Sequence, residues 1–113
     1  MANYDDGRVA CTDQELIIRH YYLIRAKHIS YSAIREVHRV PVGRMSKRRI
    51  HGSGDFIHWF NFDPRRPRKD TAFVIYLANR IRPVITPDDP DRVNAELAAH
   101  EVNVIIGRPA ELP

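Results

Sequence analysis

Two short segments concentrate positive charge and are the strongest candidates in this sequence for binding chemistry. They lie within residues 43–54 and 64–69, and their basic side chains are Arg44, Lys47, Arg48, Arg49, Arg65, Arg66, Arg68 and Lys69. Arginine carries a planar fork of donors that fits phosphate and carboxylate groups in a bidentate way. The two segments therefore predict a surface for an anionic partner. The simpler alternative is that they are solvated loops of an arginine-rich chain.

The formal charge of +4 hides an uneven distribution along the chain. Residues 39–82 carry eleven basic side chains against three acidic ones, whereas residues 83–113 carry two basic side chains against six acidic ones. A basic middle attracts phosphates, anionic lipid or the acidic region of a partner. Its opposition to an acidic end also favours head-to-tail contact between copies of the chain.

The histidines and the single cysteine do not form a recognisable metal site. The six histidines are His20, His28, His38, His51, His58 and His100, and none forms a pair with the spacing of metal ligands on one helix. Cys11 is the only cysteine, which excludes an internal disulfide and a multi-cysteine metal site. We expect no metal and no cofactor, and we interpret Cys11 as a small buried strand residue.

One acid–base pair is placed for catalysis but lacks partners. Glu36 and His38 alternate along a predicted strand and so share a face, yet no nucleophile or second acid stands beside them. The glycines of residues 52–54 do not open a helix after a strand, which argues against a phosphate-cradling loop. We therefore expect a protein that is not an enzyme. An enzyme using His38 or His58 is the weakest of the three hypotheses.

An aromatic cluster allows two interpretations. Trp59, Phe60 and Phe62 lie close to both basic segments and could form a platform on which nucleic-acid bases stack. However, both faces of the strand predicted over residues 55–63 are largely apolar. This pattern favours aromatic side chains that fill the core.

The elements that must position these residues are mostly strands. Runs of β-branched and aromatic residues predict strands over 8–11, 15–24, 28–37 (interrupted by a turn at 30–33), 55–63, 71–78 and 81–85. Pro41 cannot donate to a strand ladder, so the run Val40–Val42 lies at a sheet edge or ends a strand. Residues 102–106 either extend the last helix or add a short edge strand.

The sequence signals one helix start clearly, at residues 89–91. It follows the strand predicted over 81–85, and only the possible edge strand at 102–106 comes after it. Asp89 is a good N-cap, Pro90 suits the first helical position, and Asp91 adds negative charge near the positive end of the helix dipole. Val93 and Leu97 then lie one turn apart and form a narrow apolar stripe. These signals predict a helix over about 90–101 that covers one end of a β-rich core.

Three segments resemble the bacterial pleckstrin-homology-like families. They are residues 29–37, the Trp59 strand with its hairpin, and residues 84–90. The resemblance implies a mainly β fold, a β-barrel of two bent antiparallel sheets capped by the C-terminal helix. It implies one domain over 8–106, with an N-terminal extension at 1–7 and a flexible tail at 107–113. Many relatives bind phosphoinositides in the loop between their first two strands, which here is short and acidic (Thr12–Gln14).

Together these observations predict a non-enzymatic binding or assembly domain. It would meet a protein partner or a second copy of itself through a strand edge near Val40–Val42, or through the basic segments. The alternative is electrostatic binding of anionic membrane lipid or nucleic acid through the same arginine-rich loops. The acidic N-terminus does not resemble a secretory signal, and no apolar run approaches the roughly 18 residues that span a bilayer. We therefore expect a cytoplasmic protein.

Overall fold

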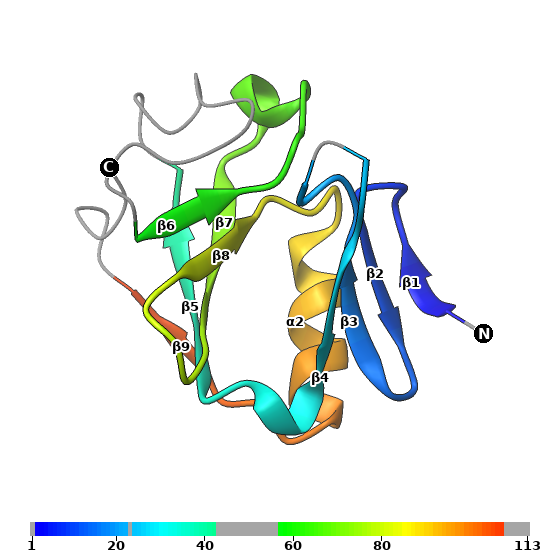
Figure 1. The fold of residues 1–113 in the computed structure, drawn as a ribbon, viewed down its shortest axis with the longest axis vertical. Coiled ribbons are helices and arrows are strands. Elements are labelled where there is room, and N and C mark those ends of the chain that lie inside the picture. Colours follow the sequence, from blue (N-terminus) through cyan, green and yellow to red (C-terminus); the bar gives the residue numbers. More distant parts are fainter. Residues whose placement is uncertain (1, 23, 43–56, 108–113) are drawn as a thin grey trace.

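Four short strands form an antiparallel sheet at the N-terminal end of the computed structural model, which describes residues 2–22, 24–42 and 57–107. They are β1 (Ala2–Asp5), β2 (Val9–Thr12), β3 (Glu15–Ile18) and β4 (Lys27–Ser30), and they pair in sequence order. The 3₁₀ turn η1 (Tyr31–Ala33) leads from this sheet to the next one (Figure 1). The turn expected near residues 30–33 is confirmed.

The second sheet has five strands in the order β6-β8-β7-β5-β9. Its members are β5 (Glu36–Pro41), β6 (His58–Phe60), β7 (Thr71–Tyr76), β8 (Arg82–Ile85) and β9 (Val104–Ile106). The central strands β5, β7 and β8 are antiparallel, but β9 runs parallel to β5 and β6 runs parallel to β8. The expectation of two purely antiparallel sheets is therefore wrong. Helix α2 lies on the connection from β8 to β9, which carries the chain across the sheet to the far side of β5.

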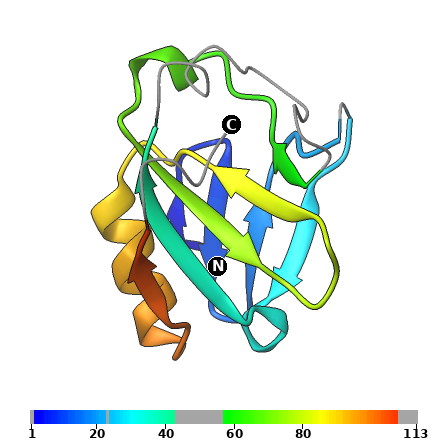
Figure 2. The ribbon, with the colours of Figure 1, turned by 90° about the vertical axis from the view of Figure 1, so that its left-hand side faces the viewer.

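The mainly β architecture with one C-terminal helix is confirmed in outline. In the described part of the chain, α2 (Pro90–Ala99) is the one α-helix, and it packs against β1 and β9 at one end of the two sheets (Figures 1 and 2). No helix of the described residues is long and apolar enough to cross a membrane. The 3₁₀ turn η2 (Arg66–Arg68) precedes β7.

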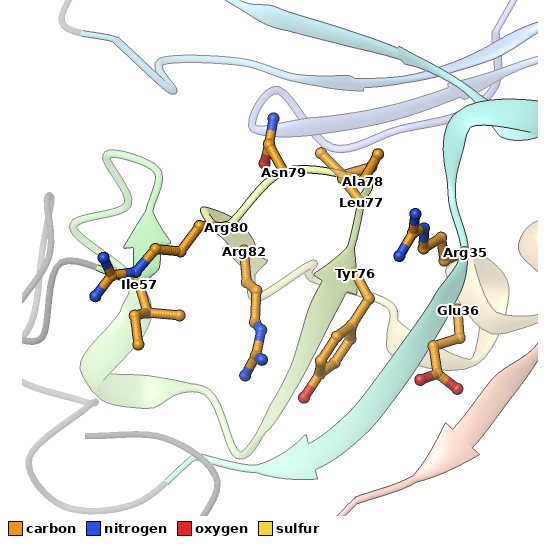
Figure 3. A pocket seen from close by; sticks show the side chains of 9 residues that line it. All are labelled: Arg35, Glu36, Ile57, Tyr76, Leu77, Ala78, Asn79, Arg80 and Arg82. Carbon is orange, nitrogen blue, oxygen red and sulfur yellow. The ribbon is translucent and has the colours of Figure 1, made fainter.

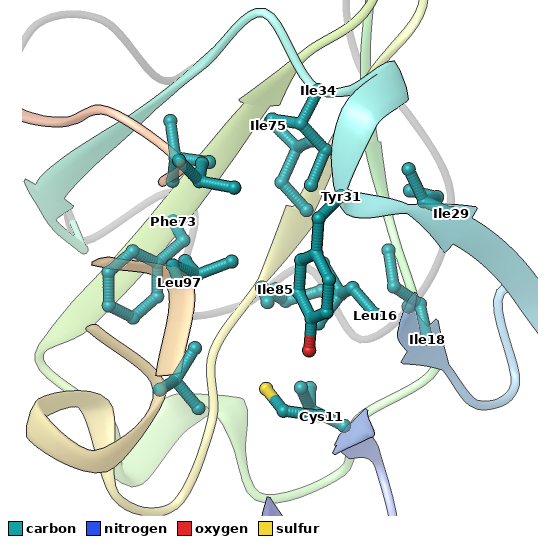
Figure 4. Close-up of a cluster of buried hydrophobic side chains, with 14 of the residues drawn as sticks. Cys11, Leu16, Ile18, Ile29, Tyr31, Ile34, Phe73, Ile75, Ile85 and Leu97 are labelled. Carbon is teal, nitrogen blue, oxygen red and sulfur yellow. The ribbon is translucent and has the colours of Figure 1, made fainter. Parts of the chain in front are cut away.

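The main core lies between the sheets and beneath α2 (Figure 4). Leu16 and Ile18 of β3 and Ile75 of β7 all belong to this cluster, and all three side chains are fully buried. The Tyr31 ring stands in the middle, and its hydroxyl donates to the carbonyl of Thr12 at 2.8 Å. The buried hydroxyl is thus hydrogen-bonded, as an apolar core requires.

Cys11 lies in this core and has no exposed surface, so its expected role as a buried strand residue is confirmed. Burial raises the pKa of its thiol to about 12, because the charged thiolate is poorly solvated there. We expect Cys11 to be inert to an aromatic disulfide reagent at pH 8 and to react rapidly once urea unfolds the chain. Reaction of the native protein at the rate of the unfolded one would contradict this burial.

The helix start is confirmed in detail. The Asp89 carboxylate accepts a hydrogen bond from the backbone N–H of Arg92 at 3.1 Å, and Pro90 is the first helical residue. Val93 and Leu97 are fully buried. The cap and the apolar stripe are local features, which is why the sequence pattern was sufficient to place them.

Residues 1–7 contain a strand of the first sheet, although the sequence pattern predicted an extension. Tyr4 of β1 is 8% exposed, and its hydroxyl accepts from the backbone N–H of Asp89 at 3.0 Å. The same hydroxyl donates to Asp6, which also accepts from the backbone N–H of Asp88. β1 therefore holds the start of α2. Burial opposes ionisation of Asp6, but these hydrogen bonds outweigh it and lower the pKa of its carboxyl.

The strands predicted over 15–24 and 55–63 are shorter in the structure, whereas the predicted end of β5 is confirmed. The strand expected over 15–24 ends at Ile18, because the chain turns at His20, whose φ is 55°. Of the strand expected over 55–63, the structure shows His58–Phe60, and residues 55–56 lie outside the described part. β5 ends at Pro41 as predicted.

β9 covers the edge of β5 just before the run Val40–Val42, where the sequence predicted an exposed edge. β9 pairs with Val37 to Arg39 of β5, and the N–H of Gly107 donates to the carbonyl of Arg39 at 2.9 Å. Residues 102–106 thus supply the edge strand, one of the two alternatives for that segment. The tail expected from residue 107 lies outside the described residues apart from Gly107.

Candidate functional site

The two predicted basic segments have different outcomes. Arg44, Lys47, Arg48 and Arg49 lie outside the described residues, so their role stays a prediction. Arg65, Arg66, Arg68 and Lys69 lie in and around η2, on the connection from β6 to β7. These two strands do not pair, because β8 lies between them, so the hairpin expected after the Trp59 strand is wrong. The surroundings of these four basic residues show which of them face solvent.

Arg66 is completely buried. Its Nη2 donates to Oδ1 of Asn61 at 2.7 Å, and its Nε donates to the hydroxyl of Thr86 at 3.2 Å. Its guanidinium carbon lies 5.1 Å from the centre of the Phe60 ring. A guanidinium in this position stabilises the fold and presents no donor to an external ligand.

Lys69 is also directed inward. Its Nζ lies 2.6 Å from Oδ2 of Asp63, which is 1% exposed, and 2.9 Å from Oδ1 of Asp88. The hydroxyl of Thr86 donates to the same Asp63 oxygen at 3.0 Å. We call the buried residues Asn61, Asp63, Arg66 and Thr86, together with the partly buried Lys69, the Asp63 cluster. It joins η2 to the end of β8.

Arg65 and Arg68 remain on the surface. Arg65 pairs with Asp88 at 3.0 Å, although its side chain is 63% exposed. Arg68 is exposed as well. Binding of an anion by these two arginines stays a prediction, whereas the other two cations of the segment belong to the Asp63 cluster.

The aromatic residues divide between the core and a surface hollow. Phe60 is fully buried, which supports the core interpretation for that ring. Trp59 is partly buried, and its indole N–H donates to the carbonyl of Tyr21 at 2.8 Å. A hollow of about 330 Å³, which we call the aromatic hollow, is lined by Tyr21, Tyr22, Lys27, Trp59, Asn79 and Ile81. Its apolar lining can receive a side chain of a partner.

Exposed apolar side chains surround this hollow. Tyr22 is 49% exposed and Ile81 is 38% exposed. The Tyr21 and Tyr22 rings meet edge to face with centroids 5.1 Å apart. The Nζ of Lys27 lies 5.3 Å from the centre of the Tyr21 ring. The hollow thus combines rigid aromatic walls with one cation.

A second cavity lies beyond the turn between β7 and β8, which contributes Asn79 to both (Figure 3). Its volume is about 320 Å³, and we call it the arginine cavity; it is lined by Arg35, Glu36, Ile57, Tyr76, Leu77, Ala78, Asn79, Arg80 and Arg82. The sequence pattern does not reveal the arginine cavity, because its three arginines are scattered along the chain. The one local signal is the pair Arg80 and Arg82, which follows the predicted turn at Asn79.

The predicted acid–base pair shares a face, as expected. Nε2 of His38 lies 3.4 Å from Oε1 of Glu36, and the His38 ring lies against the Tyr76 ring with centroids 4.3 Å apart. Glu36 lines the arginine cavity, but His38 is not among the residues that line it. His58 is buried in β6. Among the described residues, no three His, Cys, Asp or Glu side chains gather as metal ligands would.

The described residues form a mainly β domain of two sheets and one α-helix, and the aromatic hollow and the arginine cavity flank the turn between β7 and β8. Comparisons of this chain with models of known protein families, with curated proteins and with solved structures found no match.

Proposed function

We propose that this protein is a non-enzymatic binding domain of pleckstrin-homology-like fold that recognises a segment of a protein partner in the aromatic hollow. The order of elements supports the proposed fold: a four-stranded sheet, then a second sheet with the antiparallel strands β5, β7 and β8 at its centre, then helix α2. The exposure of Tyr22 and Ile81 beside the half-buried Trp59 carries the proposed function. Exposed aromatic and aliphatic groups around a concavity mark protein contact sites.

The charges around the hollow indicate the chemistry of the partner. Lys27 is the only charged residue among those lining the hollow, and Arg80 precedes Ile81 in the adjoining turn. Neither cation has a carboxylate partner within the described part of the chain. A complementary segment therefore carries an aromatic or aliphatic anchor with Asp or Glu beside it.

Peptide selection tests this proposal, and Trp59 is its probe because it is the only tryptophan in the chain. Random twelve-residue peptides displayed on phage are selected on the whole protein, and enriched sequences are synthesised and titrated by Trp59 fluorescence. We expect enriched peptides to pair an apolar anchor with acidic residues. Ile81→Ser should weaken their binding about tenfold, the value of burying one aliphatic side chain.

Ile106→Ser is the matched control, because Ile106 is 78% exposed on β9, away from the hollow. We expect it to leave the affinity within about twofold. The proposal is wrong if no peptide changes Trp59 emission or if the two variants bind equally. Enrichment of acidic peptides without an anchor would favour general electrostatic association instead. A dimer in light scattering that Ile81→Ser dissociates would assign the hollow to a second copy of the chain.

A further inference from the structure

Three arginines from separate parts of the chain line the arginine cavity. Arg35 follows η1, Arg82 begins β8, and Arg80 lies in the turn before it. In Figure 3 the side chains of Arg82 and Tyr76 extend side by side, Arg35 stands just before β5 on the other side of Tyr76, and Arg80 extends toward Ile57. This gathering is independent of the aromatic hollow and of the proposed protein partner.

None of these three guanidinium groups has a carboxylate partner within the described residues. Other arginines of the chain do: Arg19 lies 2.6 Å from Asp5, and Arg39 lies 2.8 Å from Asp91. Like charges around one concavity repel one another and raise the local concentration of anions. The cavity therefore presents positive charge that the protein itself leaves uncompensated.

The backbone fixes the positions of two of these arginines. The guanidinium carbon of Arg82 lies 4.4 Å from the centre of the Tyr76 ring, and the backbone N–H of Arg82 donates to the carbonyl of Ile57 at 2.6 Å. The N–H of Arg35 donates to the carbonyl of Tyr76 at 2.8 Å. The backbone bonds fix where both side chains begin, and the Arg82 side chain, held against a ring, loses less entropy when it binds a ligand.

The composition of the lining indicates which anion fits. Three arginines against Glu36 leave a formal excess of two positive charges, which matches a phosphate monoester dianion better than a monovalent carboxylate. The carboxylate of Glu36 also lies near Nε2 of His38. Ile57 and Leu77 add an apolar wall on which the organic part of an ester can lie.

We propose that the arginine cavity binds a phosphate monoester, with Arg35 and Arg82 contacting the phosphate oxygens and Arg80 completing the charge. A planar guanidinium donates to two oxygens of a phosphate at once, and such charge-assisted bonds are the strongest hydrogen bonds at protein surfaces. The chemistry is that of the phosphate group, whether it comes as a small ester or as inorganic phosphate.

Calorimetric titration of the whole protein with phenyl phosphate tests the site. We expect saturable one-to-one binding that Arg35→Gln and Arg82→Gln each weaken about tenfold. Arg68→Gln is the matched control, because Arg68 is also a surface arginine but lies outside this cavity. The affinity of this variant for phenyl phosphate should stay within about twofold of the wild-type value. Equal affinities for the three variants would overturn the proposal, as would the absence of saturable binding.

Two further ligands and one stability measurement complete the test. Inorganic phosphate should bind the same site, and a weaker affinity than that of phenyl phosphate would support the role of the apolar wall. Benzoate binding as tightly as phenyl phosphate would overturn the assignment to phosphate. Without ligand, Arg35→Gln should melt no lower than the wild type, because it relieves repulsion. Arg82→Gln also loses the contact with the Tyr76 ring, so that variant is judged by its affinity alone. A lower melting temperature for Arg35→Gln would show that this arginine serves folding and would also overturn the proposal.

Discussion

Replacing Asp63 with alanine is expected to destabilise the protein by about 3 kcal/mol, because it removes the carboxylate at the centre of the Asp63 cluster. Lys69 would lose its partner at 2.6 Å, while the hydroxyl of Thr86 and the backbone N–H of Arg65 would lose their acceptor. Removing one member of a buried ion pair costs about 3–5 kcal/mol, and the lower end applies because Lys69 keeps Asp88. Urea denaturation measures the loss.

Asp91→Ala is the matched control for this prediction. Asp91 pairs with Arg39 at 2.8 Å, but its side chain is 87% exposed. Exposed ion pairs contribute about 0–1 kcal/mol, so the free energy of unfolding should fall by less than about 1 kcal/mol. Equal losses for the two variants would mean that the Asp63 cluster is solvated in solution, contrary to its burial in the structure.

Replacing Leu97 with alanine is expected to cost about 2–5 kcal/mol. Leu97 lies on the inner face of α2 and is fully buried, in the same cluster as Phe73 and Ile85 from the second sheet. Truncation removes apolar contacts and leaves a cavity where the helix covers the end of the core. Alanine has a slightly higher helix propensity than leucine, so the loss reports packing and not helix formation.

Ile106→Ala provides the comparison, since it also removes most of an aliphatic side chain but at a position that is 78% exposed. Its effect on the free energy of unfolding should stay within about 0.5 kcal/mol. If Leu97→Ala also changed stability by less than about 1 kcal/mol, α2 would not cover the core, and the helix would be peripheral to the fold.

The features that the sequence predicted correctly are those that interactions between residues close in the chain determine. The cap at Asp89 needs only the N–H of a residue three positions on, and the turn at Tyr31–Ala33 lies between two strands that it joins directly. Pro41 ends β5 because its ring removes a donor, whatever the strand meets. Such signals act locally, so they survive without knowledge of the tertiary fold.

The strands at the sheet edges depended on distant partners. β1 carries Asn3 and Asp5 beside Tyr4 and gives no hydrophobic pattern, yet pairing with β2 and contact with α2 make it a strand. The sequence pattern left residues 102–106 between helix and strand, and β9 forms because β5 offers it an unpaired edge. Nothing in either segment specifies the direction of that pairing.

Arg66 and Arg68 are neighbours of the same type in the same turn, and the sequence offered no way to separate them. One is fully buried beside Thr86 and Phe60, and the other is exposed. The arginine cavity illustrates the same point, because the folding of β5 against β7 and β8 brings Arg35 to the residues around Tyr76.

The sequence by itself determined a mainly β domain whose last helix starts at Asp89 and Pro90, together with an excess of positive charge in its middle. Only the tertiary structure decided which cations face inward and which surround a cavity. The physical reason is that the charge of an arginine is a property of its side chain alone. Its burial and its partners depend on residues that the fold brings from elsewhere in the chain.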